Sequence, residues 1–404
     1  MAIPAGSKGG YFGPLRETGA DLVRFASDLP YYQSAHRLHT VRTLGLYVNT
    51  DCNLACEHCY YQIANGYRAA EGLPADRLIQ RLAPALDTEV LLFAFVGKEV
   101  FLPGPRGAAK TLKVLEFLAD ARDHGRQLRL GAVTNGTHLD RSLPSLEGIR
   151  LDFLDISFDG PDAASHDALR GPGAFERSTR NLAKAVTAGV ASKVFVASTL
   201  YRGNLVTLAN ILDFHDRFGV NHFSVMPIVA VQDDAQSISL RDLLEFVSRR
   251  LPEKASALPA GPPLQVVVDI DSYMVARQLD AFAALLEGTT VQLDDLNNVV
   301  MRRSLGRLEL VLRISLPDPC NSYGCITHDG LYFDKGGCLF MKKGYERHAL
   351  GSVASTPVDA LIARHEARAK ELSDRRGREL FSDAASDLVN GAEHTEFYSV
   401  PQLA

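Results

Sequence analysis

The sequence lacks the features of a membrane or exported protein. None of its 404 residues fall in an uninterrupted apolar run near the roughly 18 residues that a spanning helix needs. The first ten residues, MAIPAGSKGG, contain no apolar signal core. The net charge of -5 gives no reason to expect a nucleic-acid partner. We therefore expect a cytoplasmic protein that binds neither membranes nor nucleic acids.

Cysteine is scarce, and its distribution is uneven. The chain has six cysteines, and none lies between residues 60 and 319. In a long cytosolic chain such grouping favours metal binding or catalysis over disulfides. Two groups of three therefore predict two metal centres. The groups are Cys52, Cys56, Cys59 and Cys320, Cys325, Cys338.

The length and composition favour a soluble protein of more than one domain. A chain of 404 residues exceeds what one compact core usually spans. Hydrophobic residues make up 46% and charged residues 23%, as in globular proteins. Six short apolar runs alternate with helical patterns, which predicts a parallel sheet with right-handed crossovers. The predicted strands are Leu44–Asn49, Val90–Val96, Leu128–Thr134, Asp152–Ser157, Lys193–Thr199 and His222–Met226.

We predict an α/β fold, a partial (β/α)6 TIM-type barrel followed by a small β-hairpin and helix domain that carries an auxiliary cluster. The alternation stops at Pro252, where the last barrel helix, opened by Ser239 and Asp242, is expected to end. The predicted divisions are an N-terminal extension (1–43), the barrel (44–252), a linker with a strand and a helix (253–310), the auxiliary-cluster domain (311–356), and a C-terminal helix and tail (357–404).

The first cysteine group lies on a loop that leaves a predicted strand. Its spacing is C-x3-C-x2-C, within Thr50-Asp51-Cys52-Asn53-Leu54-Ala55-Cys56-Glu57-His58-Cys59-Tyr60. Three thiolates this close can surround one soft metal centre. A structural zinc site needs four ligands, and His58 could complete one. An iron–sulfur cluster held by three cysteines instead leaves one iron open for a substrate or cofactor.

This stretch resembles the signature of the radical S-adenosylmethionine (SAM) superfamily. The resemblance implies that Cys52, Cys56 and Cys59 ligate a [4Fe–4S] cluster whose open iron binds SAM. It implies reductive cleavage of SAM to a 5′-deoxyadenosyl radical that abstracts hydrogen from substrate. It also implies an electron donor such as flavodoxin or ferredoxin, and it places His58 and Tyr60 beside the cofactor.

The resemblance extends to later strand ends. Gly97 and Glu99 match a Gly-Gly-Glu-Pro motif that receives the SAM ammonium, although Lys98 and Val100 depart from it. Glu99 is chemically apt, because a cationic amine needs a nearby anion. The resemblance assigns the remaining SAM contacts to Asn135, Ser157, Met226 and Arg170, whose planar guanidinium suits a carboxylate. Asp159 lies on the same side of the extended chain as Ser157, so we expect it to be available to the same pocket.

The second cysteine group lies in a glycine-rich segment with a hairpin signal at Asp329-Gly330. We expect Cys338 to lie across this hairpin from Cys325. The segment resembles the truncated auxiliary-cluster domain called twitch, whose longer form is SPASM. This implies a second [4Fe–4S] cluster on the three cysteines, with one further ligand from Asp318, Asp334, His328 or substrate. A zinc site completed by His328 is the alternative.

Together these motifs predict a radical SAM enzyme whose auxiliary cluster accepts an electron or binds substrate. The expected reaction is oxidative or bond-forming modification of a ribosomally made peptide, of the kind found in natural product biosynthesis. The alternative is dehydrogenation or rearrangement of a small polar metabolite such as an aminocyclitol, sugar or nucleotide. A non-catalytic zinc-binding scaffold is a remote third possibility.

Overall fold

The computed structural model describes residues 39–59, 72–228, 236–271, 290–296, 298–315, 323–334 and 349–371. Several sequence predictions fall outside these residues. They are the structure of most of the N-terminal extension, the helix of the predicted linker, and the positions of Tyr60, Asp318, Cys320 and Cys338. No helix among the described residues is long and apolar enough to span a bilayer.

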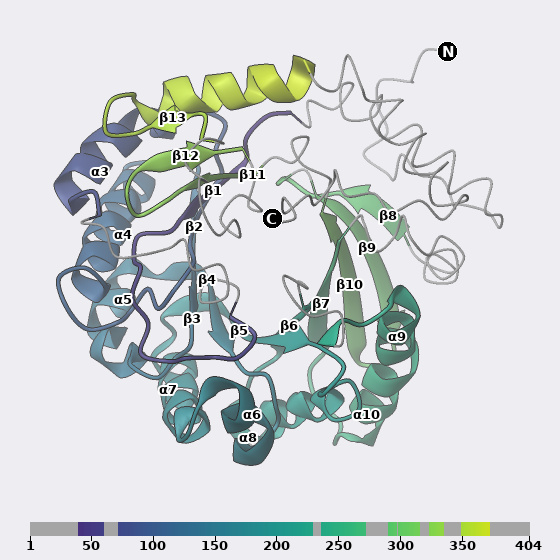
Figure 1. Ribbon diagram of the computed structural model, residues 1–404. Helices are drawn as coiled ribbons and strands as arrows, with labels where there is room; N and C mark the ends of the chain where they lie inside the picture. Colours follow the sequence, from purple (N-terminus) through teal and green to yellow (C-terminus); the bar gives the residue numbers. More distant parts are fainter. Residues whose placement is uncertain are drawn as a thin grey trace, which may run out of the picture.

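In the described part of the chain, one curved sheet of 13 strands forms the framework, and it does not close on itself (Figure 1). Its order is β13-β12-β11-β1-β2-β3-β4-β5-β6-β7-β10-β9-β8. Neighbouring strands from β11 through β10 pair in parallel, and the outer strands at both edges pair antiparallel. The predicted α/β fold with a partial parallel barrel is confirmed.

The strands agree closely with the six predicted ones and then continue the sheet. β7 pairs in parallel with β6, and β10 with β7, so the sheet extends beyond residue 252. The strands are β1 (Thr43–Leu46), β2 (Leu92–Phe95), β3 (Arg129–Thr134), β4 (Leu151–Ser157), β5 (Ala191–Leu200), β6 (His222–Pro227), β7 (Leu264–Asp271), β8 (Thr290–Leu293), β9 (Val299–Leu305), β10 (Leu308–Ser315), β11 (Tyr323–Ile326), β12 (Leu331–Phe333) and β13 (Gly351–Ser352).

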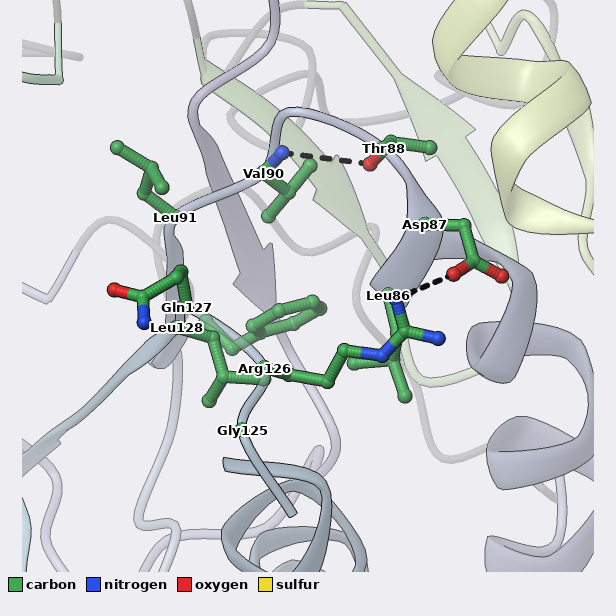
Figure 2. Close-up of a pocket in the computed structure, with 10 residues that line it drawn as sticks. Leu86, Asp87, Thr88, Val90, Leu91, Gly125, Arg126, Gln127 and Leu128 are labelled. Atoms are coloured by element: carbon green, nitrogen blue, oxygen red, sulfur yellow. Dashed lines mark hydrogen bonds and ion pairs between the residues drawn. The ribbon is translucent and has the colours of Figure 1, made fainter. Parts of the chain in front are cut away.

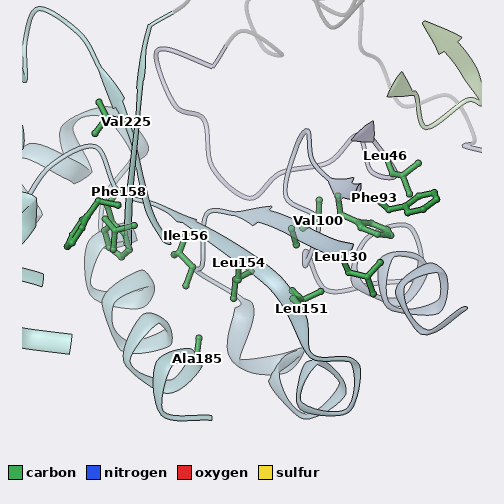
Figure 3. Close-up of a cluster of buried hydrophobic side chains, with 14 of the residues drawn as sticks. Leu46, Phe93, Val100, Leu130, Leu151, Leu154, Ile156, Phe158, Ala185 and Val225 are labelled. Atoms are coloured by element: carbon green, nitrogen blue, oxygen red, sulfur yellow. The ribbon is translucent and has the colours of Figure 1, made fainter. Parts of the chain in front are cut away.

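Helices cover the outside of the sheet (Figure 1). They are α3 (Ala75–Leu82), α4 (Ala108–Asp123), α5 (Leu143–Ile149), α6 (Ala163–Arg170), α7 (Ala174–Ala188), α8 (Phe214–Phe218), α9 (Leu240–Glu245), α10 (Leu251–Ala257), the 3-10 segments Ala83–Asp87, Leu139–Arg141 and Leu208–Asp213, and a last helix over 358–371. Their apolar faces pack on the outward side chains of the strands, among them Phe93, Leu130, Leu154 and Ile156 (Figure 3).

Helix ends follow local chemistry, with one correction. Ser239 and Asp242 form the predicted capping box at the start of α9. The predicted helix end before Pro252 is wrong, because helical structure continues to Ala257. A π-helical segment, Phe246–Arg250, precedes α10, and Pro252 lies in the first turn of α10. A proline is tolerated there because its missing N–H would have no partner in a first turn.

The C-terminal hairpin joins the barrel sheet directly. β11 pairs in parallel with β1, which places Cys325 beside Gly45. Asp329 and Gly330 lie in the turn between β11 and β12, as predicted. The residue opposite Cys325 on β12 is Phe333. The predicted position of Cys338 across the hairpin falls outside the described residues.

The close approach of β11 to the outer core gives a first prediction. A methyl at Gly324 would lie 2.3 Å from the Tyr332 hydroxyl, which His365 Nδ1 contacts at 3.1 Å inside the core. We expect Gly324→Ala to destabilise the fold by about 1–3 kcal/mol, because the Tyr332 ring, which contacts His365, would have to move to make room for the methyl group. Gly148→Ala in α5 is the control, since its methyl meets nothing within 4 Å, and it should stabilise by roughly 0.5–1 kcal/mol. Urea unfolding checks both, and equal stability would contradict the close packing at Gly324.

Candidate functional site

The first cysteine group lies on the loop after β1, at the carboxyl ends of the parallel strands, where α/β barrels place their active sites. Backbone bonds fix this loop at both ends. Glu99 N donates to Asp51 O at 3.2 Å, and Glu57 N donates to Leu169 O at 3.1 Å. The loop is therefore attached to the residues after β2 and to α6 before any ligand binds.

The three thiols are free and partly exposed. Cys52 Sγ accepts hydrogen bonds from Leu54 N at 3.4 Å and from Asn135 Nδ2 at 3.6 Å. Burial raises the pKa of the Cys52 thiol, and it raises the pKa of Cys56 to about 11 although Arg170 opposes this. Ligation must therefore displace protons, because thiolates are the metal-binding form.

Three free cysteines on one loop can hold an iron–sulfur cluster with one iron left open. Among the described residues, no three His, Cys, Asp or Glu side chains gather closely enough to hold one metal ion. A zinc ion takes its thiolates at about 2.3 Å and so requires close convergence. A cubane distributes its thiolates over separate iron atoms. His58 Nε2 lies 3.3 Å from Asp159 Oδ2.

Asp159 is the charged centre beside this loop. Its side chain is fully buried at the end of β4, and Arg170 Nε donates to its Oδ2 at 2.5 Å. Thr199 N donates to the other oxygen at 2.8 Å. Burial alone would raise the pKa of Asp159, but Arg170, His58 and Thr199 N together hold it below its ordinary value. The carboxylate thus stays ionised and orients both Arg170 and His58.

Glu99 joins the ends of β2 and β3. It is 2% exposed, and its Oε1 accepts from Thr134 Oγ1 at 2.5 Å and from Phe101 N at 3.0 Å. Its Oε2 accepts from Asn135 N at 2.7 Å. Burial raises the pKa of Glu99, although the hydrogen bonds from these donors act to lower it. Both oxygens therefore have protein partners, and the carboxylate positions the backbone of the neighbouring loop.

Asn135 connects that loop to the cysteines. Its Nδ2 reaches Asn53 Oδ1 at 3.1 Å as well as Cys52 Sγ, while its Oδ1 accepts from Thr137 N at 2.9 Å. Asn53 Nδ2 in turn donates to Thr137 Oγ1 at 2.8 Å. The Thr-Asn-Gly sequence therefore makes its own turn and also supports the loop that carries Cys52.

The other predicted cofactor contacts are spread along the same rim. Gly97 has φ +111°, and a methyl there would lie 2.8 Å from the Tyr47 ring, so the position requires glycine. Ser157 ends β4 and is partly exposed. Met226 is 49% exposed near the end of β6, which excludes the core role that a methionine usually has.

Two buried residues beside Asp159 were assigned no role from the sequence. His166 is fully buried, and its Nδ1 accepts from Asp159 N at 3.3 Å. Asn204 is buried as well, and its Nδ2 donates to Asp159 O at 3.1 Å. These contacts arise from tertiary packing that no local pattern encodes.

Cys325, the one described member of the second group, is fully buried. It packs with Tyr47 and Phe333, and the partly buried Cys59 contacts the same cluster. The hairpin thus lies beside the first cysteine loop. Of the candidate further ligands, Asp334 is buried with Arg368 Nη1 3.4 Å away, and His328 O accepts from Leu73 N at 2.7 Å.

A hollow of about 330 Å³ lies at the opposite end of the strands (Figure 2). It is lined by residues just before β2 and β3, and Arg126 Nη1 pairs with Asp87 Oδ1 at 2.6 Å on its rim. The amino ends of barrel strands serve stability more often than chemistry. We therefore place the functional site at the cysteine end.

Asp155 on β4 is a further inward carboxyl that the sequence analysis did not single out. Burial raises its pKa to about 7, with Asp269 adding to the effect and Arg313 opposing it. The folded protein therefore holds this proton more tightly than the unfolded chain, so the ionised carboxyl penalises folding above pH 4 and most above pH 7.

We predict that Asp155→Asn, which is neutral at every pH, is more stable than the wild type at pH 8 by about 1–3 kcal/mol. The advantage should shrink as pH falls to 4, where the wild-type carboxyl is protonated in both states. Urea unfolding of both proteins at the two pH values checks this. An advantage that does not change with pH would contradict the raised pKa.

The chain resembles known proteins in sequence and in fold. Residues 46–214 match the family model described as the radical SAM superfamily. An AdoMet-dependent heme synthase of Nitratidesulfovibrio vulgaris is 32% identical over 201 residues, which are 47% of this chain and 49% of the relative. An AdoMet-dependent heme synthase of Oleidesulfovibrio alaskensis is 27% identical over 213 residues, which are 51% of this chain and 52% of the relative. The chain thus spans about half the length of these curated relatives.

Solved structures share the fold. The structure of native anSMEcpe with bound AdoMet has a TM-score of 0.56 at 15% sequence identity, and the match covers 82% of this chain and 83% of that chain. SuiB of Streptococcus suis bound to its precursor peptide SuiA has a TM-score of 0.59 at 12% identity, covering 90% and 73%. At these identities the likeness concerns the architecture.

Proposed function

We propose that this chain, whose residues 46–214 match the model of the radical SAM superfamily, is a member of that superfamily and an enzyme that cleaves SAM reductively and abstracts hydrogen from a substrate. Membership of this superfamily implies a [4Fe–4S] cluster and SAM as cofactors. The observation that carries the proposal is the placement of three free cysteines on a strand-end loop beside the buried Asp159–Arg170 pair.

Each residue of the site has a proposed role that follows from its chemistry. Cys52, Cys56 and Cys59 would hold the cluster, which with SAM supplies a 5′-deoxyadenosyl radical. Arg170 presents the guanidinium suited to a carboxylate, and Asp159 keeps it in place. Asn135 and Glu99 fix the loops that flank the thiols. Gly97, Ser157, His58, Tyr60 and Met226 remain proposed cofactor contacts.

The test is SAM cleavage by anaerobically reconstituted protein with dithionite or reduced flavodoxin or ferredoxin as electron donor. We expect 5′-deoxyadenosine and methionine in equal amounts. Protein reconstituted without iron is the control. Failure of the fully loaded protein to form 5′-deoxyadenosine under any of these reductants would reject the proposal.

For the substrate we propose a ribosomally made peptide that is modified oxidatively or by bond formation, with a small polar metabolite as the alternative. A second candidate is an iron tetrapyrrole, because curated relatives carry the names AdoMet-dependent heme synthase and Fe-coproporphyrin III synthase. Titration with iron coproporphyrin separates the classes. A shifted Soret band with saturation at one equivalent would favour the tetrapyrrole, and an unchanged band would favour the other substrates.

We also propose a second [4Fe–4S] cluster on Cys320, Cys325 and Cys338, which accepts an electron from the substrate radical or binds substrate. The support is the burial of Cys325 in the cluster of side chains that Cys59 also contacts. The wild type should then contain about eight irons per chain and the Cys320/Cys325/Cys338→Ala variant about four. That variant should still cleave SAM but lose product formation. Four irons in the wild type, with an unchanged spectrum in the variant, would contradict the second cluster.

A further inference from the structure

The inner face of the sheet is polar along the strands β4, β7 and β10. Asp155, Asp269 and Arg313 occupy inward positions there, since their neighbours Leu154, Val268 and Leu312 belong to the outer core. Solvent reaches this face, because the side chains of Arg313 and Asp269 are 38% and 18% exposed. Polar side chains in such a place are available to a substrate rather than used for packing.

Arg313 and Asp269 form a closed pair. They are direct partners in the register of β10 and β7. Arg313 Nε donates to Asp269 Oδ1 at 2.5 Å, and Nη2 donates to Oδ2 at 2.7 Å. Such a two-point pair neutralises both charges and has a fixed geometry. The nearby Asp294 carboxylate is occupied by donors from its own turn, Leu296 N and Asn298 N.

Asp155 lies on the same inner face of the sheet as this pair. Its carboxyl has neither a hydrogen bond nor an ion pair with any residue in the described part of the chain, although the charges of Arg313 and Asp269 both act on it. Its register neighbours on β3 and β5 are the apolar Val133 and Phe195. Of the three carboxyl groups of Asp155, Asp269 and Asp294, only that of Asp155 has no hydrogen-bond or ion-pair partner among the described residues.

The position relative to the proposed cofactor site is favourable. Asp155 precedes Ser157 by two residues on the same side of β4, and Asp159 follows the end of that strand. At about 3.3 Å per residue, Asp155 lies roughly 7 Å below Ser157 along the strand. A substrate group held at Asp155 would thus be inside the barrel, beneath the rim that carries Arg170 and the cysteines.

We propose that Asp155, with the Arg313–Asp269 pair beside it, binds a positively charged amine or guanidine group of the substrate. This inference rests on the proposed function, because it takes the barrel interior to be the substrate site. An amine donates to a carboxylate and compensates its charge, which an alcohol does only in part. The pair at Arg313 and Asp269 adds no net charge and limits the space around the amine.

The test uses the reconstituted holoenzyme with SAM and two probes of matched size, n-butylammonium and n-butanol, in isothermal titration calorimetry. We expect wild-type protein to prefer the ammonium at least tenfold and Asp155→Asn to lose that preference. Because Asp155 titrates near pH 7, binding of the ammonium should weaken about tenfold from pH 8 to pH 6. A purely structural role of Asp155 would produce no such pH profile.

Two variants serve as controls. Glu309→Gln removes a negative charge elsewhere on the inner face, at a carboxylate that Gln265 and Arg302 contact. Asp123→Asn removes a negative charge from the outer surface. Both should retain the preference. No ammonium binding by the wild type, equal binding of butanol, or an equal loss in Glu309→Gln would overturn the proposal. Formation of 5′-deoxyadenosine by the same wild-type sample without probe reports separately on the proposed function.

Discussion

Replacing Cys52, Cys56 and Cys59 together by alanine is expected to abolish SAM cleavage and to remove about four irons per chain. The reason is that these thiols are free, lie on one strand-end loop, and are the proposed ligands of the cluster. We expect little change in the fold, because all three are only partly buried and their loop is fixed by backbone bonds from Glu99 and Glu57.

Iron analysis and 5′-deoxyadenosine formation measure both effects, and circular dichroism checks the fold. The matched control is the Cys320/Cys325/Cys338→Ala variant, which also loses three thiols but should still cleave SAM. If the variant at the first cysteine group cleaves SAM at the wild-type rate, these three residues do not hold the cluster.

Asp159→Asn is expected to destabilise the protein by about 3–5 kcal/mol and to weaken SAM binding strongly. The substitution leaves the guanidinium of Arg170, 11% exposed, without its anionic partner, and breaking a buried pair costs this much because one charge remains uncompensated. It also weakens the contacts by which Asp159 orients His58 and Arg170, and Arg170 is the proposed partner of the SAM carboxylate.

The control is Glu245→Gln, which breaks the exposed pairs with Arg249 and Arg250. Surface pairs of this kind contribute about 0–1 kcal/mol. Thermal unfolding and calorimetric SAM titration of both variants check the prediction. Similar stability and SAM affinity in both would mean that Asp159 does not organise the site.

The sequence predicted the barrel and the cysteine loop well because local patterns encode both. Each of the six strands is a short apolar run, and the Ser239–Asp242 capping box formed as expected. The C-x3-C-x2-C spacing located the site without any tertiary information. Pro252 misled the prediction, because a proline ends a helix in its interior but is accepted in the first turn of the next one.

Long-range contacts could not be predicted. The pairing of β11 with β1, the burial of His166 behind Asp159, and the approach of Asp155 to Arg313 join residues that are far apart in the chain. Glu99 was expected to face the cofactor, and its two oxygens are held by Thr134, Phe101 and Asn135. These arrangements depend on how curved strands bring side chains together, which a periodic pattern does not specify.

The most direct test of the account is electron paramagnetic resonance of the reduced Cys320/Cys325/Cys338→Ala variant, in which only the proposed SAM-binding cluster remains. We predict the signal of one reduced [4Fe–4S] cluster, a changed spectrum when SAM is added, and loss of that response when SAM is replaced by adenosine. A spectrum that SAM leaves unchanged, or no iron–sulfur signal, would contradict a cluster with an open iron on Cys52, Cys56 and Cys59.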